Sequence, residues 1–461
     1  MWWGPSLASE DDSKTIKHSA VGAHRAGDLV RAQKLYAQYL ARNPRDAGTL
    51  SNLGVLNRTM GRHSIALALQ EKAHRINPED AGIRTNLANI LSDLGQYDRS
   101  LKLREALLSA EPEHLDQLAM VGRCHRGKGD YQAATEHLSA ALVKHPNDPE
   151  LNMQLAFACL GKGDYATGFD AYRWRWSAGE LEPRSLSLPE WEGQPLTGRT
   201  VVVLPEQGFG DAIFYARFLT ILKELGATVR LCAEAPVLPI LEGLPGADEV
   251  VLFTLENIRG DYWVNLIDLA LYHFRSSDDL PPPTQLTIPE QSAHRAQNRT
   301  NPFDEVFRVG VVWSGSETYK GNAFRSFHPM EFAALTALPN VQLFSLYKGS
   351  NMQAFEDAGL PGLIVDAASD DRHFGDCAAT MMQMDLVITS DTATAHIAGS
   401  LGVPTWVLLH WDPFWVWRHT GETAEWYPSV RIFRQAKPQD WTGVFAKVEN
   451  ALKVEMAGRY G

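Results

Sequence analysis

The chain has 461 residues, more than a single hydrophobic core normally supports, so we expect two or three domains. Hydrophobic residues make up 44% and charged residues 21% of it, an ordinary globular composition that argues against long disordered stretches. The formal net charge of -12 gives no reason to expect nucleic acid or an anionic membrane as the main partner, so any phosphate binding has to be local.

The sequence carries no sign of an export or membrane-spanning segment. Its first residues, MWWGPSLASEDDSK, lack the basic start and the apolar core of a signal peptide, and no uncharged apolar run reaches about 18 residues. The cysteines are widely spaced and form no CxxC pair; they are Cys124, Cys159, Cys232 and Cys377. We therefore expect buried thiols rather than disulfides, and a cytoplasmic protein.

The first third of the chain is a repeat with a period of 34 residues. Five glycines and four prolines keep this step: Gly27, Gly61, Gly95, Gly129 and Gly163, and Pro44, Pro78, Pro112 and Pro146. This spacing predicts two helices per unit, joined by a glycine-centred turn and followed by a proline-marked loop.

These positions resemble the tetratricopeptide repeat family, which has the same period and places Gly, Tyr, Ala and Pro in the same way. The resemblance implies an α-solenoid over residues 15–178, in which stacked helix pairs curve around an extended concave face. One interpretation is a scaffold that stabilises or dimerises the protein. The other, which we favour, is a groove that holds a polypeptide.

A boundary follows the last repeat. The segment YATGFDAYRWRW has aromatic residues at alternate positions, so Tyr172, Trp174 and Trp176 do not share one helix face, and we expect some of them to pack against the next domain. Residues 179–198, which include LPEWEGQPLTG, are expected to form a connector.

From residue 199 short apolar runs alternate with helical stretches, as in parallel sheets built from βαβ units. VVVLP, VRLCAE, EVVLF and YWVNLID predict one α/β lobe over residues 199–290. RVGVVWSG, VQLFSLY, LIVDA, LVITSD and TWVLLH predict a second over residues 291–461, with a Pro-rich hinge between the two groups. Two doubly wound lobes facing each other would bind a ligand in a cleft at the carboxyl ends of their strands.

The loop after the first strand of the first lobe reads PEQGFGDAIF. Gly208 and Gly210 permit a tight turn and close approach of a ligand, and they leave Asp211 at the start of a helix. The plain alternative for Asp211 is that it caps this helix and does nothing else. A dinucleotide site is an alternative, because GFG begins the GxGxxG pattern and Glu234 follows the second strand. Against it, Ile213 stands where the third glycine belongs.

Two loops of the second lobe carry groups suited to phosphate. The loop after its first strand offers hydroxyls, backbone amides and positive charge, from Ser314, Gly315, Ser316, Lys320 and Arg325.

The second of these loops is the stretch SDTATAH, which lies between an apolar strand and a helix. If Ser390 or Asp391 caps this helix, Thr392 and His396 lie one turn apart near its N-terminus, where unpaired N–H groups favour an anion. A packed, hydrogen-bonded histidine is the plainer alternative; we favour ligand contact.

Together, QGFGDAIFYARF, GVVWSGS with FRSFHP, MDLVITSDTATAHIAGSLGVPTWVLL and WYPSVRIFRQ resemble bacterial glycosyltransferases that carry tetratricopeptide repeats and whose catalytic part is similar to the heptosyltransferase family. The resemblance implies a GT-B fold with two Rossmann-like lobes. It implies Asp211 and His396 as catalytic residues, the aspartate as general base. The donor-binding residues it suggests are Gly208, Gly210, Ser314, Gly315, Ser316, Lys320, Arg325, Asp391, Thr392, Ala393 and His396. Relatives tend to carry DWRW where this chain reads DPFWVWRH, which leaves the contacts of Trp415, Trp417 and Arg418 open.

Transfer of a sugar builds positive charge at the anomeric carbon and negative charge on the departing phosphate, so fixed donors around that phosphate lower the barrier. The chain has no DxD triplet, and we expect neither a metal nor a cofactor beyond the nucleotide-sugar co-substrate. An ionised Asp211 can accept the proton of the acceptor hydroxyl, which predicts inversion.

The function expected from the sequence is transfer of a hexosyl, heptosyl or nonulosonic acid group to Ser or Thr of a protein held by the repeats, with flagellin a candidate by resemblance only. One alternative is a non-catalytic interaction protein whose glycosyltransferase domain is degenerate. Another is an NAD-dependent oxidoreductase, which Ile213 disfavours.

Overall fold

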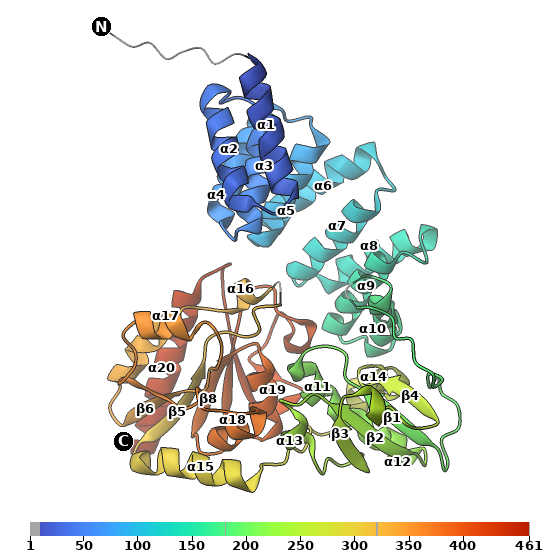
Figure 1. Cartoon of the computed structure of the whole chain (residues 1–461), viewed down its shortest axis with the longest axis vertical. Coiled ribbons are helices and arrows are strands. Elements are labelled where there is room, and N and C mark those ends of the chain that lie inside the picture. The colour runs from blue at the N-terminus through green and yellow to red at the C-terminus, as the bar shows by residue number, and fades with distance from the viewer. Residues whose placement is uncertain (1–9, 180, 320, 461) are drawn as a thin grey trace. The chain divides into compact units, whose positions relative to one another are not determined.

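A computed structural model describes residues 10–179, 181–319 and 321–460 of the chain (Figure 1). Lys320, one of the residues predicted to bind phosphate, lies outside the described residues. The chain divides into two compact units, one ending at Gln154 and the other beginning at Leu155.

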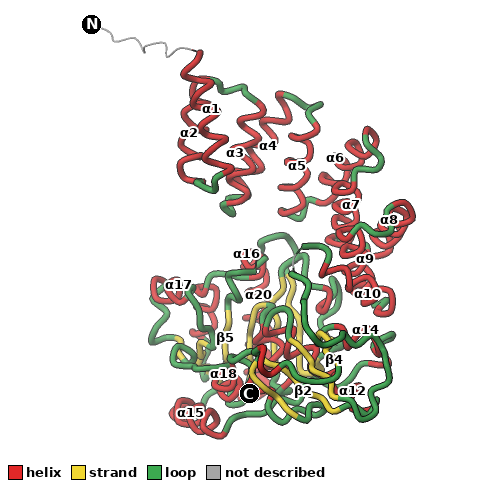
Figure 2. The backbone as a smooth tube through the Cα atoms, turned by 45° about the vertical axis from the view of Figure 1, so that its right-hand side comes forward, coloured by secondary structure: helices red, strands yellow, loops and turns green. Residues whose placement is uncertain are grey.

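The first unit consists of helix hairpins, in which α1 pairs with α2, α3 with α4, α5 with α6 and α7 with α8 (Figure 2). Its helices are α1 (Glu10–Arg25), α2 (Leu29–Arg42), α3 (Ala47–Thr59), α4 (His63–Ile76), α5 (Ala81–Asp93), α6 (Tyr97–Ala110), α7 (Leu115–Gly127), α8 (Tyr131–Lys144) and the first part of α9 (Pro149–Lys162). The predicted α-solenoid of tetratricopeptide repeats is confirmed.

The period of the sequence reflects the turns of these hairpins. Gly27 and Gly61 have φ of 77° and 72°, a left-handed conformation that favours glycine at the end of a helix. Three of the proline-marked loops end in an aspartate that caps the next helix, and the loop before α7 ends in His114 without a side-chain cap. Asp46 accepts a hydrogen bond from the backbone N–H of Thr49 at 2.8 Å, and Asp80 caps α5 in the same way. Turns and caps thus recur with the repeat.

The second unit begins within α9 and contains α10 (Tyr165–Tyr172) and the short 3-10 helix η1 (Arg173–Trp176), followed by two separate sheets. The first sheet is wholly parallel, with strand order β3-β2-β1-β4. Its strands are β1 (Thr200–Leu204), β2 (Thr228–Ala233), β3 (Glu249–Leu252) and β4 (Tyr262–Asn265). The helices of this lobe are α11 (Phe209–Tyr215), α12 (Thr220–Glu224), α13 (Leu238–Leu241) and α14 (Asp268–His273).

The second sheet has the order β10-β11-β9-β8-β5-β6-β7 and is parallel except for β10. Its strands are β5 (Phe307–Val312), β6 (Val341–Ser345), β7 (Ile364–Asp366), β8 (Leu386–Ser390), β9 (Thr405–Leu409), β10 (Thr423–Ala424) and β11 (Tyr427–Arg434). Its helices are α15 (Glu290–Thr300), α16 (Asn322–Arg325), α17 (Met352–Asp357), α18 (Phe374–Met381), α19 (Ala393–Ser400) and α20 (Trp441–Tyr460). The predicted arrangement of two parallel-sheet lobes is therefore present.

The structure corrects the sequence analysis at the expected hinge. The second half of this Pro-rich segment is not an open linker, because residues from Glu290 to Thr300 form α15, which packs against α18. Ser292 of α15 is buried and donates a hydrogen bond to the carboxylate of Asp376 in α18. This part of the segment is a fixed helix of the second lobe.

Helix α10 packs against both lobes of the second unit. The Tyr165 ring lies 4.3 Å from that of Phe274 in the first lobe and 5.6 Å from that of Trp426 in the second, measured between ring centroids. Tyr172 is buried, and its hydroxyl lies 3.3 Å from Oε1 of Gln207. The expectation that aromatic residues of this segment pack against the next domain is confirmed.

A buried ion cluster fixes η1 to the first lobe. The guanidinium of Arg175 donates to the carboxylates of Glu206 and Asp268, with 2.8 Å in each ion pair. Its side chain is only 2% exposed, so the charge depends on these partners. The cysteines are also buried as predicted, and none of the four forms a disulfide.

Candidate functional site

The three loops singled out in the sequence all leave the carboxyl ends of parallel strands. The Gly208 loop follows β1, the Ser314 loop follows β5, and Asp391 and Thr392 connect β8 with α19. Ligands of doubly wound sheets bind at this end of the strands. The positions of the loops therefore agree with a shared binding site.

Asp211 is the third residue of α11, whose N-cap is Gly208. The half-buried carboxylate turns back toward the cap, and its Oδ2 atom accepts a hydrogen bond of 3.1 Å from the backbone N–H of Gly208. Capping, the plain alternative for this residue, is thus part of what it does. Burial raises the pKa of Asp211 to about 6, and the nearby Asp391 carboxylate acts in the same direction, against the Gly208 N–H and the positive charge of Arg325.

Helix α11 approaches α19 closely at Gly210. A β carbon at this position would lie 2.9 Å from Cδ2 of His396 and 3.4 Å from Cα of Ala393, so a larger residue would push the two helices apart. Gly210 thereby brings the start of α11, with Asp211, against the first turn of α19. The sequence analysis proposed these residues for one site, and the structure brings them together.

The Ser314 loop meets the same helix at Gly315. A β carbon on Gly315 would lie 2.7 Å from Nη2 of Arg325 and 2.7 Å from Cγ2 of Thr392. Two loops that follow β5 and β8 are therefore in contact, and the cation lies beside the start of α19. The electrostatic influence of Arg325 on both Asp211 and His396 agrees with this placement.

Thr392 itself caps α19, whereas the sequence analysis considered Ser390 or Asp391 as the cap. No side-chain hydrogen bond to the backbone accompanies this cap. Instead the Thr392 hydroxyl lies 2.6 Å from that of Thr394, which in turn lies 2.7 Å from that of Thr389. The first turn of α19 thus keeps N–H groups that no side chain caps, and such groups attract anions.

His396 lies on this first turn and is half-buried. Its Nδ1 atom is 3.0 Å from the hydroxyl of Tyr427, a fully buried residue at the start of β11. The guanidinium of Arg217 lies 4.9 Å from the centroid of the Tyr427 ring, on its face. Burial lowers the pKa of His396 to about 4, and the cations Arg217 and Arg325 act in the same direction, so the imidazole is neutral at pH 7.

Arg325 is held in place without a carboxylate partner among the described residues. Its Nε atom donates to Oδ1 of Asn322 at 3.2 Å, and its guanidinium stacks on the Tyr319 ring, 4.5 Å from the centroid. An arginine positioned in this way keeps its charge available for an anionic ligand.

The serines of this loop differ in position. Ser314 is buried and its hydroxyl lies 3.0 Å from that of Ser326, so it holds the loop together. Ser316 is exposed, and its hydroxyl lies 2.8 Å from that of Thr318. Of the two, only Ser316 offers a hydroxyl at the surface.

Trp417 is a residue of the site whose contact the sequence analysis left open. Its indole Nε1 donates a hydrogen bond of 2.7 Å to Oδ1 of Asp391, and its ring lies 5.5 Å from that of His396. Trp415 and Arg418 instead face α10, where Trp415 joins the aromatic cluster and Arg418 donates to the hydroxyl of Tyr165. The Trp-rich motif was visible in the sequence, but its partner was not.

Within the described part of the chain, His, Cys, Asp and Glu side chains form no cluster of three that could hold a metal ion. None of the helices in this part is both long and apolar enough to cross a membrane.

Comparison with known proteins identifies the repeats. Residues 47–77 and 85–149 match tetratricopeptide repeat families. Protein FlbA of Caulobacter vibrioides is 26% identical over 317 residues, which are 62% of this chain and 52% of that protein. The chain thus spans about half the length of this curated relative.

Among solved structures, MamA residues 41–end of Desulfovibrio magneticus RS-1 is 19% identical, with a TM-score of 0.34, over 36% of this chain and 94% of that one. A tetratricopeptide repeat protein of Parabacteroides merdae is 20% identical, with a TM-score of 0.33, over 36% of this chain and 67% of its own. The two family-model matches establish tetratricopeptide repeats in this part of the chain.

Proposed function

We propose that this protein is a metal-independent, inverting glycosyltransferase of the GT-B fold, which transfers a sugar from a nucleotide sugar to Ser or Thr of a protein. The observation that carries the proposal is the meeting of three strand-end loops at Gly210 and Gly315, which gathers Asp211, Arg325 and His396. These groups provide a base, a cation and a neutral hydrogen-bond donor, the set that sugar transfer from a diphosphate requires.

The nucleotide diphosphate would lie at the start of α19. Uncapped N–H groups of this helix, the neighbouring Arg325 and the neutral His396 would donate to its oxygens and stabilise the charge that builds as the sugar–phosphate bond breaks. In comparable sites the loss of one such donor costs about 2.7–4 kcal/mol of transition-state stabilisation.

His396 can donate from Nε2 if its Nδ1 accepts. Arg217, which can only donate hydrogen bonds, interacts with the Tyr427 hydroxyl, and Ser400 contacts the same hydroxyl. In the proposed arrangement the hydroxyl oxygen accepts from the arginine and its proton is donated to Nδ1 of His396, which leaves the imidazole proton on Nε2. Tyr427 would then act as a positioning residue for His396.

On the acceptor side, Asp211 would take the proton of the Ser or Thr hydroxyl as its oxygen bonds to the anomeric carbon. Attack on the face opposite the leaving phosphate inverts the configuration at that carbon. A carboxylate with a pKa of about 6 is ionised at pH 7 and is a stronger base than an exposed aspartate, which suits this role.

The repeats would hold the protein acceptor, since solenoids of this kind present extended binding surfaces. Flagellin is the candidate acceptor suggested by the resemblance of the sequence to repeat-linked glycosyltransferases. In this proposal the reaction takes place in the cytoplasm, before the acceptor protein assembles.

Intact-mass analysis tests this function. Flagellin from cells that lack this gene would be incubated with the purified protein and UDP-, GDP-, ADP- or CMP-sugars, with the Asp211→Asn variant as control. A mass increment of one sugar residue, absent with the variant, supports the proposal and names the donor. Nucleotide binding without any increment on flagellin would contradict the acceptor assignment, and neither binding nor increment would favour a non-catalytic scaffold.

A further inference from the structure

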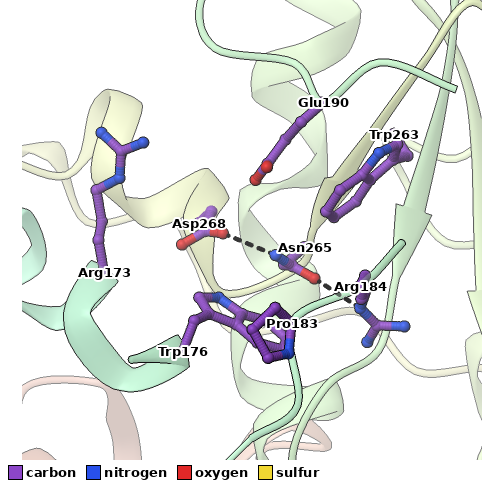
Figure 3. Close-up of a pocket in the computed structure, with 8 residues that line it drawn as sticks. All are labelled: Arg173, Trp176, Pro183, Arg184, Glu190, Trp263, Asn265 and Asp268. Carbon is purple, nitrogen blue, oxygen red and sulfur yellow. Dashed lines mark hydrogen bonds between the residues drawn. The ribbon is translucent and has the colours of Figure 1, made fainter. Parts of the chain in front are cut away.

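A pocket lies in the first lobe, outside the candidate site. It has a volume of about 220 Å³, and its lining comes from η1, from the connector, from β4 and from the first residue of α14. The lining residues are Arg173, Trp176, Pro183, Arg184, Glu190, Trp263, Asn265 and Asp268 (Figure 3). A pocket of this size has room for a small ligand.

The floor of the pocket is a fixed polar network. Asn265 donates from Nδ2 to Oδ2 of Asp268 at 3.0 Å and accepts on Oδ1 from Nε of Arg184, also at 3.0 Å (Figure 3). The other carboxylate oxygen of Asp268 is held by the buried Arg175. Each of these groups is therefore oriented before a ligand arrives, and oxygens that already accept one hydrogen bond retain a second lone pair.

The rim of the pocket carries two charged side chains, Glu190 and Arg173. Figure 3 shows Glu190 across the pocket from Trp176, with its carboxylate pointing toward Asp268 and Asn265. Neither the Glu190 carboxylate nor the Arg173 guanidinium has a hydrogen bond or ion pair with a described residue. Both residues are exposed at this rim; partial burial of the Glu190 carboxylate, with the neighbouring Asp268 acting in the same direction and Arg173 against it, raises its pKa.

The charges of the lining and the backbone pairing of β4 exclude two classes of ligand, strongly charged molecules and extended peptides. The lining holds two arginines and two carboxylates, so a strongly charged ligand gains no net attraction. An extended peptide cannot add to β4 at this edge, because the connector already pairs there: Trp191 N–H donates to the carbonyl of Trp263, and Trp263 N–H to that of Pro189. A hydroxyl group, by contrast, donates to a carboxylate and accepts from a guanidinium, and can use both kinds of side chain at once.

We infer that this pocket binds a neutral saccharide unit, with Glu190, Asp268 and Asn265 accepting from its hydroxyls and Arg173 and Arg184 donating to them. The guanidinium groups of Arg175 and Arg184 stack on the Trp176 ring, 5.4 and 5.8 Å from its centroid, and hold this side of the pocket in place. The inference adds a binding site to the molecule and does not require the proposed transfer reaction.

Saturation-transfer-difference NMR on the full chain tests the inference, with glucose, galactose and N-acetylglucosamine as neutral probes and glycylglycine as a zwitterionic peptide. At least one sugar is expected to give signals that fall at least tenfold in Glu190→Ala and in Arg173→Ala. Glu192→Ala, an exposed change on the same connector but outside the pocket, should leave them unchanged.

Three results would overturn the inference. They are the absence of signals from all three sugars, sugar signals that Glu190→Ala does not reduce, and glycylglycine signals that alone depend on Glu190. Arg325→Ala separates this pocket from the candidate transfer site. If sugar signals disappear in that variant and persist in Glu190→Ala, the saccharide binds at α19, and the pocket assignment is wrong while the proposed function stands.

Discussion

The indole N–H of Trp417 donates a hydrogen bond of 2.7 Å to the carboxylate of Asp391, the residue that precedes the N-cap of α19. Both side chains are buried. Trp417→Phe keeps a large aromatic ring but leaves this carboxylate without its donor, which costs about 1–3 kcal/mol. We expect a lower melting temperature and weaker nucleotide binding, because Asp391 positions the loop that begins α19. Thermal unfolding and calorimetry measure the two effects.

Trp191→Phe is the matched control for this variant. Trp191 is also buried, and its Nε1 donates to a backbone oxygen, that of Gln194, at 2.8 Å. Loss of this hydrogen bond should lower the stability of the fold without changing the affinity for the nucleotide. Equal losses of affinity in both variants would show that Trp417 acts through general stability alone.

Asp211→Asn separates catalysis from stability. Burial raises the pKa of Asp211 from 3.8 to about 6, so the native state holds this proton more tightly than the unfolded chain does, and ionisation destabilises the fold as the pH rises from about 4 to 6. An uncharged amide removes this cost. The variant should therefore unfold at the same or a higher temperature at pH 7, while kcat falls by about 100-fold to 10,000-fold.

The control for Asp211→Asn is Asp170→Asn, at an exposed residue that pairs with Arg275 at 3.1 Å. It should change neither kcat nor the melting temperature by much, since exposed pairs contribute little. Full activity of Asp211→Asn would remove Asp211 from the role of base.

The pH profile of the wild-type protein should show the base directly. Below a pH of about 6 the Asp211 carboxyl is protonated and cannot accept a proton, so kcat/KM should fall about tenfold per pH unit there and level off above. The pKa of His396 lies near 4, so this imidazole stays neutral over the measured range and adds no second pH dependence to kcat/KM. A profile that is flat from pH 5 to pH 8 would contradict the assignment.

Tyr427→Phe tests the positioning of His396. Without the hydroxyl, the neutral imidazole is free to carry its proton on Nδ1, and donation from Nε2 is lost in part of the molecules. Turnover should fall about tenfold, and 15N shifts of His396 should report the change of tautomer. Tyr272→Phe removes a comparable hydroxyl, which donates to the carbonyl of Trp191, and should leave both readouts unchanged. Unchanged 15N shifts in Tyr427→Phe would show that the Tyr427 hydroxyl does not set the tautomer of His396.

Two patterns of the sequence predict most of the fold: the 34-residue spacing of the glycines and the series of short apolar runs. The spacing of Gly27, Gly61 and their successors predicts the helix hairpins, because a left-handed glycine ends the first helix of each pair. Each apolar run predicted as a strand contains one, since strands of parallel sheets are buried on both faces. The two-residue strand β10 and the eight-residue strand β11 lack such a pattern; β11 mixes buried and exposed residues and was not predicted.

The candidate site was predicted only in part. Local patterns identify Asp211 and His396, which lie where a strand becomes a helix, a position that any doubly wound lobe offers to a ligand. The contacts of His396 with Tyr427 and of Asp391 with Trp417 join residues 31 and 26 positions apart. Such contacts depend on how β11 and the Trp-rich segment pack against α19, and no local pattern in one sequence encodes that packing.

The most direct test of the central claim is calorimetry with UDP, GDP, ADP, CMP and NAD. We predict that one nucleotide of the first four binds, that Arg325→Ala weakens it by at least about tenfold through loss of a charge-assisted contact, and that Asp211→Asn and the exposed control Arg431→Ala leave its affinity unchanged. Binding of NAD alone, no binding at all, or an affinity that Arg325→Ala does not alter would contradict a nucleotide-sugar site at the start of α19.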